Sequence, residues 1–528
     1  MSHRIIKGLP DSLGWRSLFF DSALTRVGKI PDAKIRPILN LVQISDTHIC
    51  DAQSPARVEF LDRYADPHNP LAKLIGGLVG TYRAQEILTV QVLESMLRNI
   101  NRIDVGPISN FPIDALLLTG DLTDNAQQNE LNWVISTLDG EPITPDSGSV
   151  LLWEGIGGSY YSEHFWNPHG TPAGEIDDSP RRLYGFPVIP ELLNAVRAPF
   201  DTSGSRHPWL AVHGNHDLLL QGTVCSDLFL NSIATSSRKF IDIETQDALE
   251  TLSSLREVGP AHYPKPTNML SYEITPDHSR QFVNPHTWPQ RMTQTARSHG
   301  FQLVHRGTSI KYWRKDFERA TILALDTVNP FGGWQGSIDE DQFKWLSEQL
   351  HLLRNRHVVI ASHHPLQDLF NTYSPEGEKQ RIGREQIEKL LIGSSNVLLW
   401  IAGHTHRNKI LFFGTDDECG FWQIETSSLI DWPQQGRIIE IVELQNEGIF
   451  ICISMIDHAG KVDIELEDID LSDIDSLAGL SRLLSVNDWQ RRNGSNAIES
   501  NEGLAFDQNV ILRIPLRERT LRGDSRQV

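Results

Sequence analysis

Five short apolar runs in this 528-residue chain each end in a polar cluster, and this recurrence constrains the fold more than any other feature. Apolar runs of four to eight residues without polar alternation are typical of fully buried strands. The clusters that end them are Asp46-Thr47-His48, Gly120-Asp121-Leu122-Thr123-Asp124, Gly214-Asn215-His216-Asp217, His363-His364-Pro365 and Gly403-His404-Thr405-His406. We therefore expect an α/β protein that gathers these side chains at the carboxyl edge of its strands, where open α/β sheets bind ligands.

A helix is predicted between the first two of these strands. Apolar residues recur at helical spacing over residues 86–100, between strand candidates at 38–45 and 115–119. This order predicts a β-α-β unit with parallel strands. Ser337 and Glu340 form a candidate capping box for a later helix, and another helix is expected at 386–392. The remaining strand candidates are 209–213, 320–326, 357–361, 396–402, 438–444, 449–455 and 510–516.

The residue types at the strand ends are those that bind divalent first-row metal ions. Asp46 and His48 are two residues apart, so on an extended segment both side chains point the same way and can approach one ion. The candidate ligands among them are two Asp, one Asn and four or five His. This number exceeds the needs of one tetrahedral ion and suits two ions that share a carboxylate.

Composition excludes several other classes of protein. The 68 acidic and 48 basic residues give a formal charge of -20, which opposes non-specific binding to nucleic acid. The four cysteines form no CxxC pair, so neither a cysteine zinc site nor a dense disulfide framework is expected. No signal peptide and no window of 18 apolar residues is found, and we therefore expect a soluble cytoplasmic protein without a transmembrane segment.

The chain divides into three parts around the strand pattern. Residues 1–40 are an N-terminal lead-in interrupted by prolines, residues 41–456 hold the strands, and 457–528 form a C-terminal extension that begins with an acidic stretch. Two long insertions, 140–208 and 222–315, interrupt the central part. Such stretches are typical of functional loops or caps, although the first could equally be a covering over the fold. We expect the two insertions to form a cap.

Taken in this order, the five clusters resemble the signature of the calcineurin-like metallophosphoesterase superfamily: D-x-H, G-D-x-x-D, G-N-H-D/E, a later His, and G-H-x-H. The resemblance covers residues 41–456 without the insertions. It implies a four-layer αββα sandwich, in which two mixed β-sheets are flanked by helices. More narrowly, residues 45–63 look like a poorly characterised bacterial branch of the superfamily.

The resemblance also implies a ligand set for two divalent ions. One ion would be held by Asp46, His48, Asp121 and His406, and the other by Asp121, Asn215, His363 and His404, so that Asp121 bridges them. His363 is preferred because the family places this ligand two residues before a proline, and His364 is the alternative. Mn, Fe and Zn all suit such ligands. The purple acid phosphatases have Tyr where this chain has Asp124, so a ferric-tyrosinate centre is not expected.

By the same resemblance His216 would be the general acid that protonates the leaving oxygen, with Asp124 orienting it. The implied reaction is hydrolysis of a small phosphorylated substrate through attack by a metal-bridging hydroxide, with a phosphodiester slightly favoured. The alternatives are a phosphomonoesterase or nucleotide phosphohydrolase with the same site, or a catalytically silent scaffold of this fold. A scaffold should have lost ligands or His216, and every such position is filled here.

Overall fold

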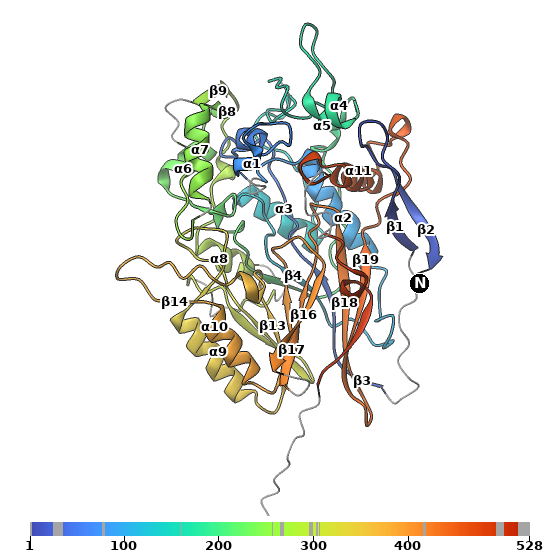
Figure 1. Ribbon diagram of the computed structural model, residues 1–528, viewed down its shortest axis with the longest axis vertical. Coiled ribbons are helices and arrows are strands. Elements are labelled where there is room, and N and C mark those ends of the chain that lie inside the picture. Colours follow the sequence, from blue (N-terminus) through green and yellow to red (C-terminus); the bar gives the residue numbers. More distant parts are fainter. Residues whose placement is uncertain are drawn as a thin grey trace, which may run out of the picture.

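The protein is built around two six-stranded mixed β-sheets, seen as the paired strands at the centre of Figure 1. The computed structural model describes residues 3–24, 35–75, 80–158, 160–255, 257–264, 269–294, 299–302, 305, 307–415, 419–492 and 501–515. Among them, no helix is both long and apolar enough to cross a membrane.

The first sheet has the strand order β20-β19-β18-β3-β4-β5. Its strands are β3 (Ile35–Ile44), β4 (Ala115–Thr119), β5 (Trp209–Val212), β18 (Gln435–Leu444), β19 (Gly448–Asp457) and β20 (Val510–Arg513). β3, β4 and β5 are parallel, whereas β18, β19 and β20 add to the edge in antiparallel fashion. The parallel pair predicted for the β-α-β unit is confirmed.

The second sheet has the order β10-β11-β13-β15-β17-β16. Its strands are β10 (Trp313–Asp316), β11 (Ala320–Ala324), β13 (His357–Ala361), β15 (Val397–Ala402), β16 (Lys409–Thr415) and β17 (Cys419–Glu425). β11, β13, β15 and β17 are parallel, and the two edge strands are antiparallel to their neighbours.

The sheets pack face to face, and helices cover their outer faces. Alternate residues of β13 show the layers: Val359 and Ala361 lie in the core shared with the first sheet, whereas Val358 and Ile360 lie in the core beneath α9 (Glu340–Leu352) and α10 (Arg384–Ile392). On the other side α2 (Thr89–Ile100) and α3 (Gln128–Asp139) cover the first sheet (Figure 1). This is the expected four-layer αββα sandwich.

Two local predictions differ from the structure. The helix at residue 340 is capped by Asp339, whose carboxylate accepts a hydrogen bond from the backbone N–H of Gln342, so the capping box from Ser337 is wrong. A carboxylate next to the helix start is the better cap, because it also interacts favourably with the helix dipole. The strand expected at 510–516 ends at Arg513, and Leu516 lies outside the described residues.

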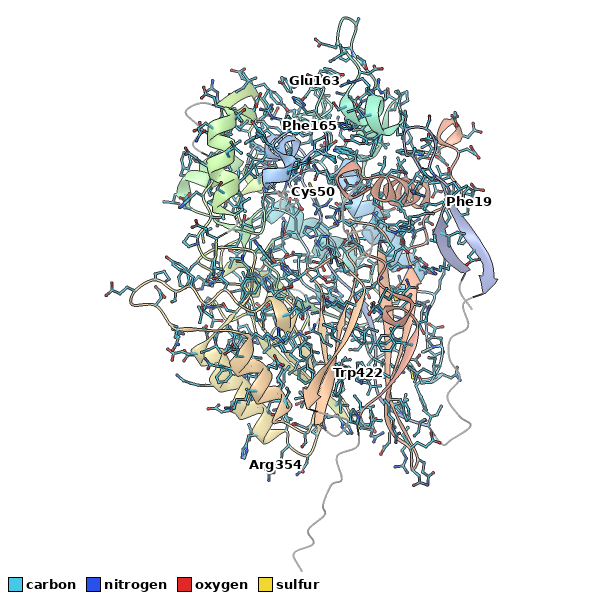
Figure 2. All side chains as sticks on the ribbon, in the orientation of Figure 1. Phe19, Cys50, Glu163, Phe165, Arg354 and Trp422 are labelled. Carbon is cyan, nitrogen blue, oxygen red and sulfur yellow. The ribbon has the colours of Figure 1, made fainter. Side chains whose placement is uncertain are left out.

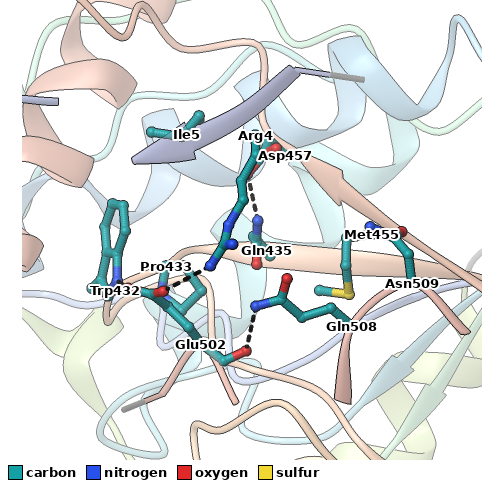
Figure 3. A pocket seen from close by; sticks show the side chains of 10 residues that line it. All are labelled: Arg4, Ile5, Trp432, Pro433, Gln435, Met455, Asp457, Glu502, Gln508 and Asn509. Atoms are coloured by element: carbon teal, nitrogen blue, oxygen red, sulfur yellow. Dashed lines mark hydrogen bonds and ion pairs between the residues drawn. The ribbon is translucent and has the colours of Figure 1, made fainter. Parts of the chain in front are cut away.

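The two ends of the chain are integrated into the fold. β1 (His3–Lys7) and β2 (Leu18–Leu24) form a hairpin, and α11 (Ile474–Val486) packs on α2. Figure 3 shows where the ends meet: Arg4 lies 3.5 Å from the carboxylate of Glu502, which also accepts a hydrogen bond from the indole of Trp432. Together with β20, these contacts make residues 457–492 and 501–515 part of the main body.

The first insertion packs against the C-terminal helices. It contains α4 (Ser179–Tyr184) and α5 (Leu192–Ala195). Its aromatic residues Phe165 and Trp166 are buried in one cluster with Cys50 and with Leu480 of α11, and Figure 2 labels Phe165 and Cys50 in this upper part of the molecule. This insertion therefore has a hydrophobic core in common with the rest of the chain.

The first part of the second insertion is seen in green in Figure 1, whereas Trp288 and Met292 of its later part lie in the main core. Its elements are β7 (Val224–Cys225), which pairs with β6 (Leu219–Leu220), then α6 (Leu228–Ala234), β8 (Arg238–Ile243), α7 (Thr245–Ser254), β9 (Met269–Glu273) and α8 (Thr287–Gln294). Outside this insertion, the smaller remaining elements are α1 (Ala72–Ile75), β12 (Ile338–Asp339), β14 (Arg381–Ile382) and α12 (Trp489–Arg492). The chain also has short 3₁₀ turns, and one of them, Ala84–Leu88, leads into α2.

Candidate metal centre

The carboxyl ends of β3, β4 and β5 from one sheet and of β13 and β15 from the other meet at one place. The backbone there is strained at five of the predicted ligands, which have positive φ angles: Asp46 (51°), His48 (42°), Asp121 (48°), His404 (70°) and His406 (55°). A residue other than glycine costs about 1–3 kcal/mol in such a conformation, and residues of this kind gather at functional sites.

Three motif glycines allow the segments to approach this closely. A Cβ on Gly403 would lie 2.3 Å from Oδ2 of Asp46, and one on Gly214 would lie 2.2 Å from Oδ1 of Asp121. Gly120 has a φ of +92°, and a Cβ there would lie 2.6 Å from Nδ1 of His363. The glycines before the polar residues are thus required by close packing among the ligands themselves.

One group of donor atoms is formed by Asp46, His48 and His406, next to Asp121. Nε2 of His48 lies 3.1 Å from Nε2 of His406 and 3.7 Å from Oδ2 of Asp121. Nε2 of His406 lies 3.5 Å from Oδ1 of Asp46. All four side chains are buried or nearly so.

A second group is formed by Asn215, His363 and His404, and it shares the same carboxylate oxygen. Nε2 of His363 lies 3.1 Å from Oδ2 of Asp121, 2.9 Å from Oδ1 of Asn215 and 3.2 Å from Nδ1 of His404. The structure therefore brings all seven predicted ligands together in two adjacent groups, with Asp121 between them.

The hydrogen bonds of these ligands leave lone pairs pointing at one another. Nδ1 of His48 is 3.0 Å from a carboxylate oxygen of Asp124, and Nδ1 of His406 is 2.5 Å from one of Asp431. Because each Nδ1 carries the proton that these acceptors need, both Nε2 atoms present lone pairs at 3.1 Å. Facing lone pairs repel unless a cation lies between them, so this arrangement fits a metal ion.

The same reasoning holds for the second group. Nδ1 of His363 donates to the carbonyl of Thr119 (2.9 Å), which leaves its Nε2 as an acceptor. The amide nitrogen of Asn215 donates to the carbonyl of Gly222 (3.0 Å), which turns Oδ1 toward His363. Nitrogen and oxygen donors of this kind suit Mn, Fe or Zn and do not distinguish among them.

The pKa shifts show that the site is short of positive charge. Burial raises the pKa of Asp121, but the neighbouring His363 and His216 outweigh it and hold the pKa well below its usual value. Burial lowers the pKa of His363, yet the carboxylates of Asp121 and Asp46 outweigh it and raise the pKa to about 9. Two carboxylates in a buried site thus favour cations beside them.

His364 has a different environment from His363. Its Nδ1 lies 2.8 Å from the hydroxyl of Thr327, and its Nε2 lies 2.9 Å from the carbonyl of Trp334. Burial, with the neighbouring His363, lowers its pKa to about 3. Both ring nitrogens are therefore engaged with the protein, whereas Nε2 of His363 faces the other donors.

His216 borders the first group, and its contact with Asp124 differs from the expectation. Nδ1 of His216 donates to the backbone carbonyl of Asp124 (2.6 Å), whereas the carboxylate of Asp124 is bound by His48 and by Arg57. The side chain of Asp124 therefore orients the ligand His48, and only its main chain orients His216. The buried Arg57 makes this the more favourable use of the carboxylate, since it supplies an ion pair to it.

Several orienting residues carry no signal in the sequence motif. Asp431 holds His406 and is itself held by Arg83 (2.9 Å) and Arg491 (2.8 Å). Arg57 lies within a buried network that also includes Glu86. These residues lie outside the five clusters, and the fold brings them to the predicted ligands. Asp217 is the last residue of its cluster, so a structural role for it could have been predicted from the sequence. Its carboxylate accepts hydrogen bonds from the backbone N–H groups of Leu122 and Thr123.

A cleft of about 340 Å³ opens above the two groups. Ligands form its floor, namely His48, Asp121, Asn215, His404 and His406. Its walls come from the segment 58–83, from residues 216–264 and from Trp334, Thr405 and Arg491. None of the described residues of the first insertion, 140–208, lines this cleft, whereas residues of the second insertion do. That the two insertions form a cap stays a prediction.

Comparison with known sequences finds the family that the sequence motifs resemble. The profile of the calcineurin-like phosphoesterase family matches residues 176–408, which include Asn215, His363, His404 and His406. The predicted resemblance to this family is thereby confirmed over these residues. The match supports a metal-dependent phosphoric ester hydrolase, and the part of the chain before residue 176 supplies the remaining candidate donors, Asp46, His48 and Asp121.

Solved structures give more distant similarities. A dimetal phosphatase from Danio rerio is 12% identical, with 80% of this chain and 97% of that chain covered and a TM-score of 0.35. GAP50, the anchor in the inner membrane complex of Plasmodium, is 10% identical, with 85% of this chain and 95% of that chain covered and a TM-score of 0.25. Curated proteins give no match.

Proposed function

We propose that this protein is a two-metal enzyme that hydrolyses phosphodiesters. The observation that carries the proposal is the convergence of seven donor side chains in two groups that share the carboxylate of Asp121. One ion would be held by Asp46, His48, Asp121 and His406, and the other by Asp121, Asn215, His363 and His404. When bound, two such ions would offset the charge of a phosphate and activate water as the nucleophile.

The residues around the ligands hold them in the orientation that the ions need. Asp124 and Asp431 fix the ring planes and tautomers of His48 and His406 by accepting from Nδ1. Partners of this kind raise the basicity of a histidine ligand, and their loss typically weakens metal affinity about 10–100-fold. The backbone N–H of His216 donates to Oδ1 of Asp121 (2.8 Å), which leaves Oδ2 toward both groups.

In this proposal His216 transfers a proton to the leaving oxygen. Its Nδ1 is committed to the carbonyl of Asp124, so Nε2 is the nitrogen that can reach a substrate in the cleft. Burial lowers the pKa of His216 to about 4, with the carboxylate of Asp121 acting in the opposite direction. A bound phosphate anion adds further negative charge and favours the protonated form. Such an acid assists a poor alkoxide leaving group, which favours diester cleavage.

Hydrolysis of two chromogenic esters tests the proposal. The purified protein, loaded with Mn(II), Fe(II) or Zn(II), is given bis(p-nitrophenyl) phosphate and p-nitrophenyl phosphate, and release of p-nitrophenolate is followed. We expect turnover of both that depends on the metal and is lost with a chelator, with a higher kcat/KM for the diester.

The outcome separates the alternatives. A higher kcat/KM for the monoester would support a phosphomonoesterase that uses the same donors. Absence of turnover with any of the three metals, in a protein shown to be folded by circular dichroism, would contradict the proposal and support a silent scaffold.

A further inference from the structure

The walls of the cleft differ in character on its two sides. Apolar side chains form one side, and they are Val58, Leu61, Leu220, Val224, Leu255, Tyr263 and Pro264. Two arginines, Arg83 and Arg491, lie on the wall beside His406, and both are bound to Asp431. Arg491 also lies 3.6 Å from the carboxylate of Asp488, so the two guanidinium groups face two carboxylates and this side of the cleft is polar and charged.

The apolar side chains of this side belong to two hydrophobic clusters that meet at the cleft, and the polar residues Gln221, Thr223, Thr251 and His262 line the cleft beside them. Leu220 and Val224 belong to a core cluster beneath the second insertion, and Val58 and Leu61 belong to a neighbouring cluster. Leu255 and Tyr263 pack against both clusters, and therefore join them across the wall of the cleft. A mainly apolar wall in an otherwise charged site binds an apolar group of a ligand, because polar groups lose hydrogen bonds there.

This wall begins directly beside His216. Leu220 and Val224 face each other in the β6–β7 hairpin, which the amide of Asn215 holds through the carbonyl of Gly222. The hairpin packs so closely that a Cβ on Gly222 would lie 2.3 Å from Cδ2 of His216. The position of the apolar wall is therefore fixed relative to the group that protonates the leaving oxygen.

We propose that the alcohol which leaves in the reaction is apolar, and that the wall formed by Val58, Leu61, Leu220, Val224, Leu255 and Tyr263 binds it. The substrate class is a phosphodiester with one apolar ester arm beside His216 and a more polar arm toward Arg83 and Arg491. This inference rests on the proposed function. In the reaction the oxygen of water bonds to phosphorus and releases a proton, the bond from phosphorus to the apolar alcohol breaks, and His216 gives its proton to that alcohol.

Binding of alkylphosphonates tests the wall without any turnover. Methyl-, butyl- and octylphosphonate are titrated into the Mn(II)-loaded protein by calorimetry. A fully buried methylene contributes about fourfold in affinity, so we expect butylphosphonate to bind at least about tenfold more tightly than methylphosphonate. The heat-capacity change of binding should become more negative with chain length, since this is the marker of apolar burial.

Matched variants locate the effect. Leu255→Gln places a polar group in the wall at a half-buried position and should remove most of the dependence on chain length. Leu228→Gln is the control in the same insertion, because Leu228 is 90% exposed and does not line the cleft. An equal loss in both variants would contradict the assignment of the wall.

Products of a mixed diester complete the test. With methyl octyl phosphate we expect octanol and methyl phosphate, whereas release of methanol would place the apolar arm on the wrong side of the phosphorus atom and overturn the inference. If methylphosphonate binds and the affinity does not rise with chain length, this inference fails while the proposed function stands. If no phosphonate binds and no ester is hydrolysed, the proposed function fails as well.

Discussion

The two long insertions look alike in sequence, yet the structure uses them differently. Both are irregular and rich in turns. Residues 140–208 bury Trp166 and Phe165 in one cluster with α11, whereas residues between 223 and 264 line the cleft above the predicted metal ligands. The difference follows from where each insertion leaves the sheet. The second continues from the His216 cluster at the end of β5, and the first follows α3, which covers the outer face.

The second insertion lines the site because its first hairpin is bound to a loop that carries a predicted ligand. The β6–β7 hairpin is bound to Asn215 through Gly222 and to Asn125 through the backbone of Gln221. The first insertion shares its core with α11 instead, so its contribution is to stability. Changes in the two regions should therefore affect different quantities.

The largest effect on activity is expected at His216, which lies just before the second insertion. His216→Ala should reduce kcat for bis(p-nitrophenyl) phosphate by about 10²–10⁴-fold, as the loss of a general acid does. Metal content, measured by plasma mass spectrometry, should be unchanged because the seven donors remain. His278→Ala, at an exposed histidine, is the control and should leave kcat unaltered. Loss of metal in His216→Ala would show that His216 is a ligand and not the acid.

A smaller effect is expected when the hairpin is displaced. Gly222 has a φ of +66°, and a methyl group there would collide with His216, so Gly222→Ala should lower kcat/KM by about 10²-fold through misplacement of that ring. Gly174 in the first insertion has a φ of +93° with nothing within 4 Å, and Gly174→Ala imposes similar backbone strain without a neighbour. Similar activities for the two variants would contradict the distinction between the insertions.

The smallest effect on activity is expected from the first insertion. Trp166 is 2% exposed in the core shared with α11, and Trp166→Ala should lower the free energy of unfolding by about 3–5 kcal/mol. Urea denaturation followed by circular dichroism measures this loss. The kcat of the folded fraction should stay within about twofold of the wild type, in keeping with a residue that does not touch the cleft. A kcat that falls with stability unchanged would place the first insertion at the site.

Much of the fold could be predicted from local patterns. The buried strands β4, β5, β13 and β15 are uninterrupted apolar runs, so their limits could be found within about a residue. The pair β16 and β17 was missed, because residues 409–425 mix polar and apolar side chains without a clear period. The contribution of the C-terminal residues to the first sheet was also missed, since pairing between β19 and β20 depends on contacts distant in sequence.

The sequence predicted the donor residues that follow strand ends, but not the residues that orient them. The seven donors follow strand ends, and parallel strands bring such residues to one edge. The partner of Asp124 could not be found in this way, because Arg57 reaches it through the fold and turns its carboxylate toward His48. Asp431 likewise carries no motif, although it fixes the ring of His406.

The central claim is that the two donor groups hold two metal ions that share Asp121, and counting the ions tests it most directly. The purified protein is saturated with Mn(II), freed of excess metal and analysed by plasma mass spectrometry beside Asp121→Ala. We predict two ions per chain in the wild type and fewer than one in the variant, with both proteins folded by circular dichroism. A single ion in the wild type, or two ions retained by Asp121→Ala, would contradict the shared carboxylate and the two-metal site with it.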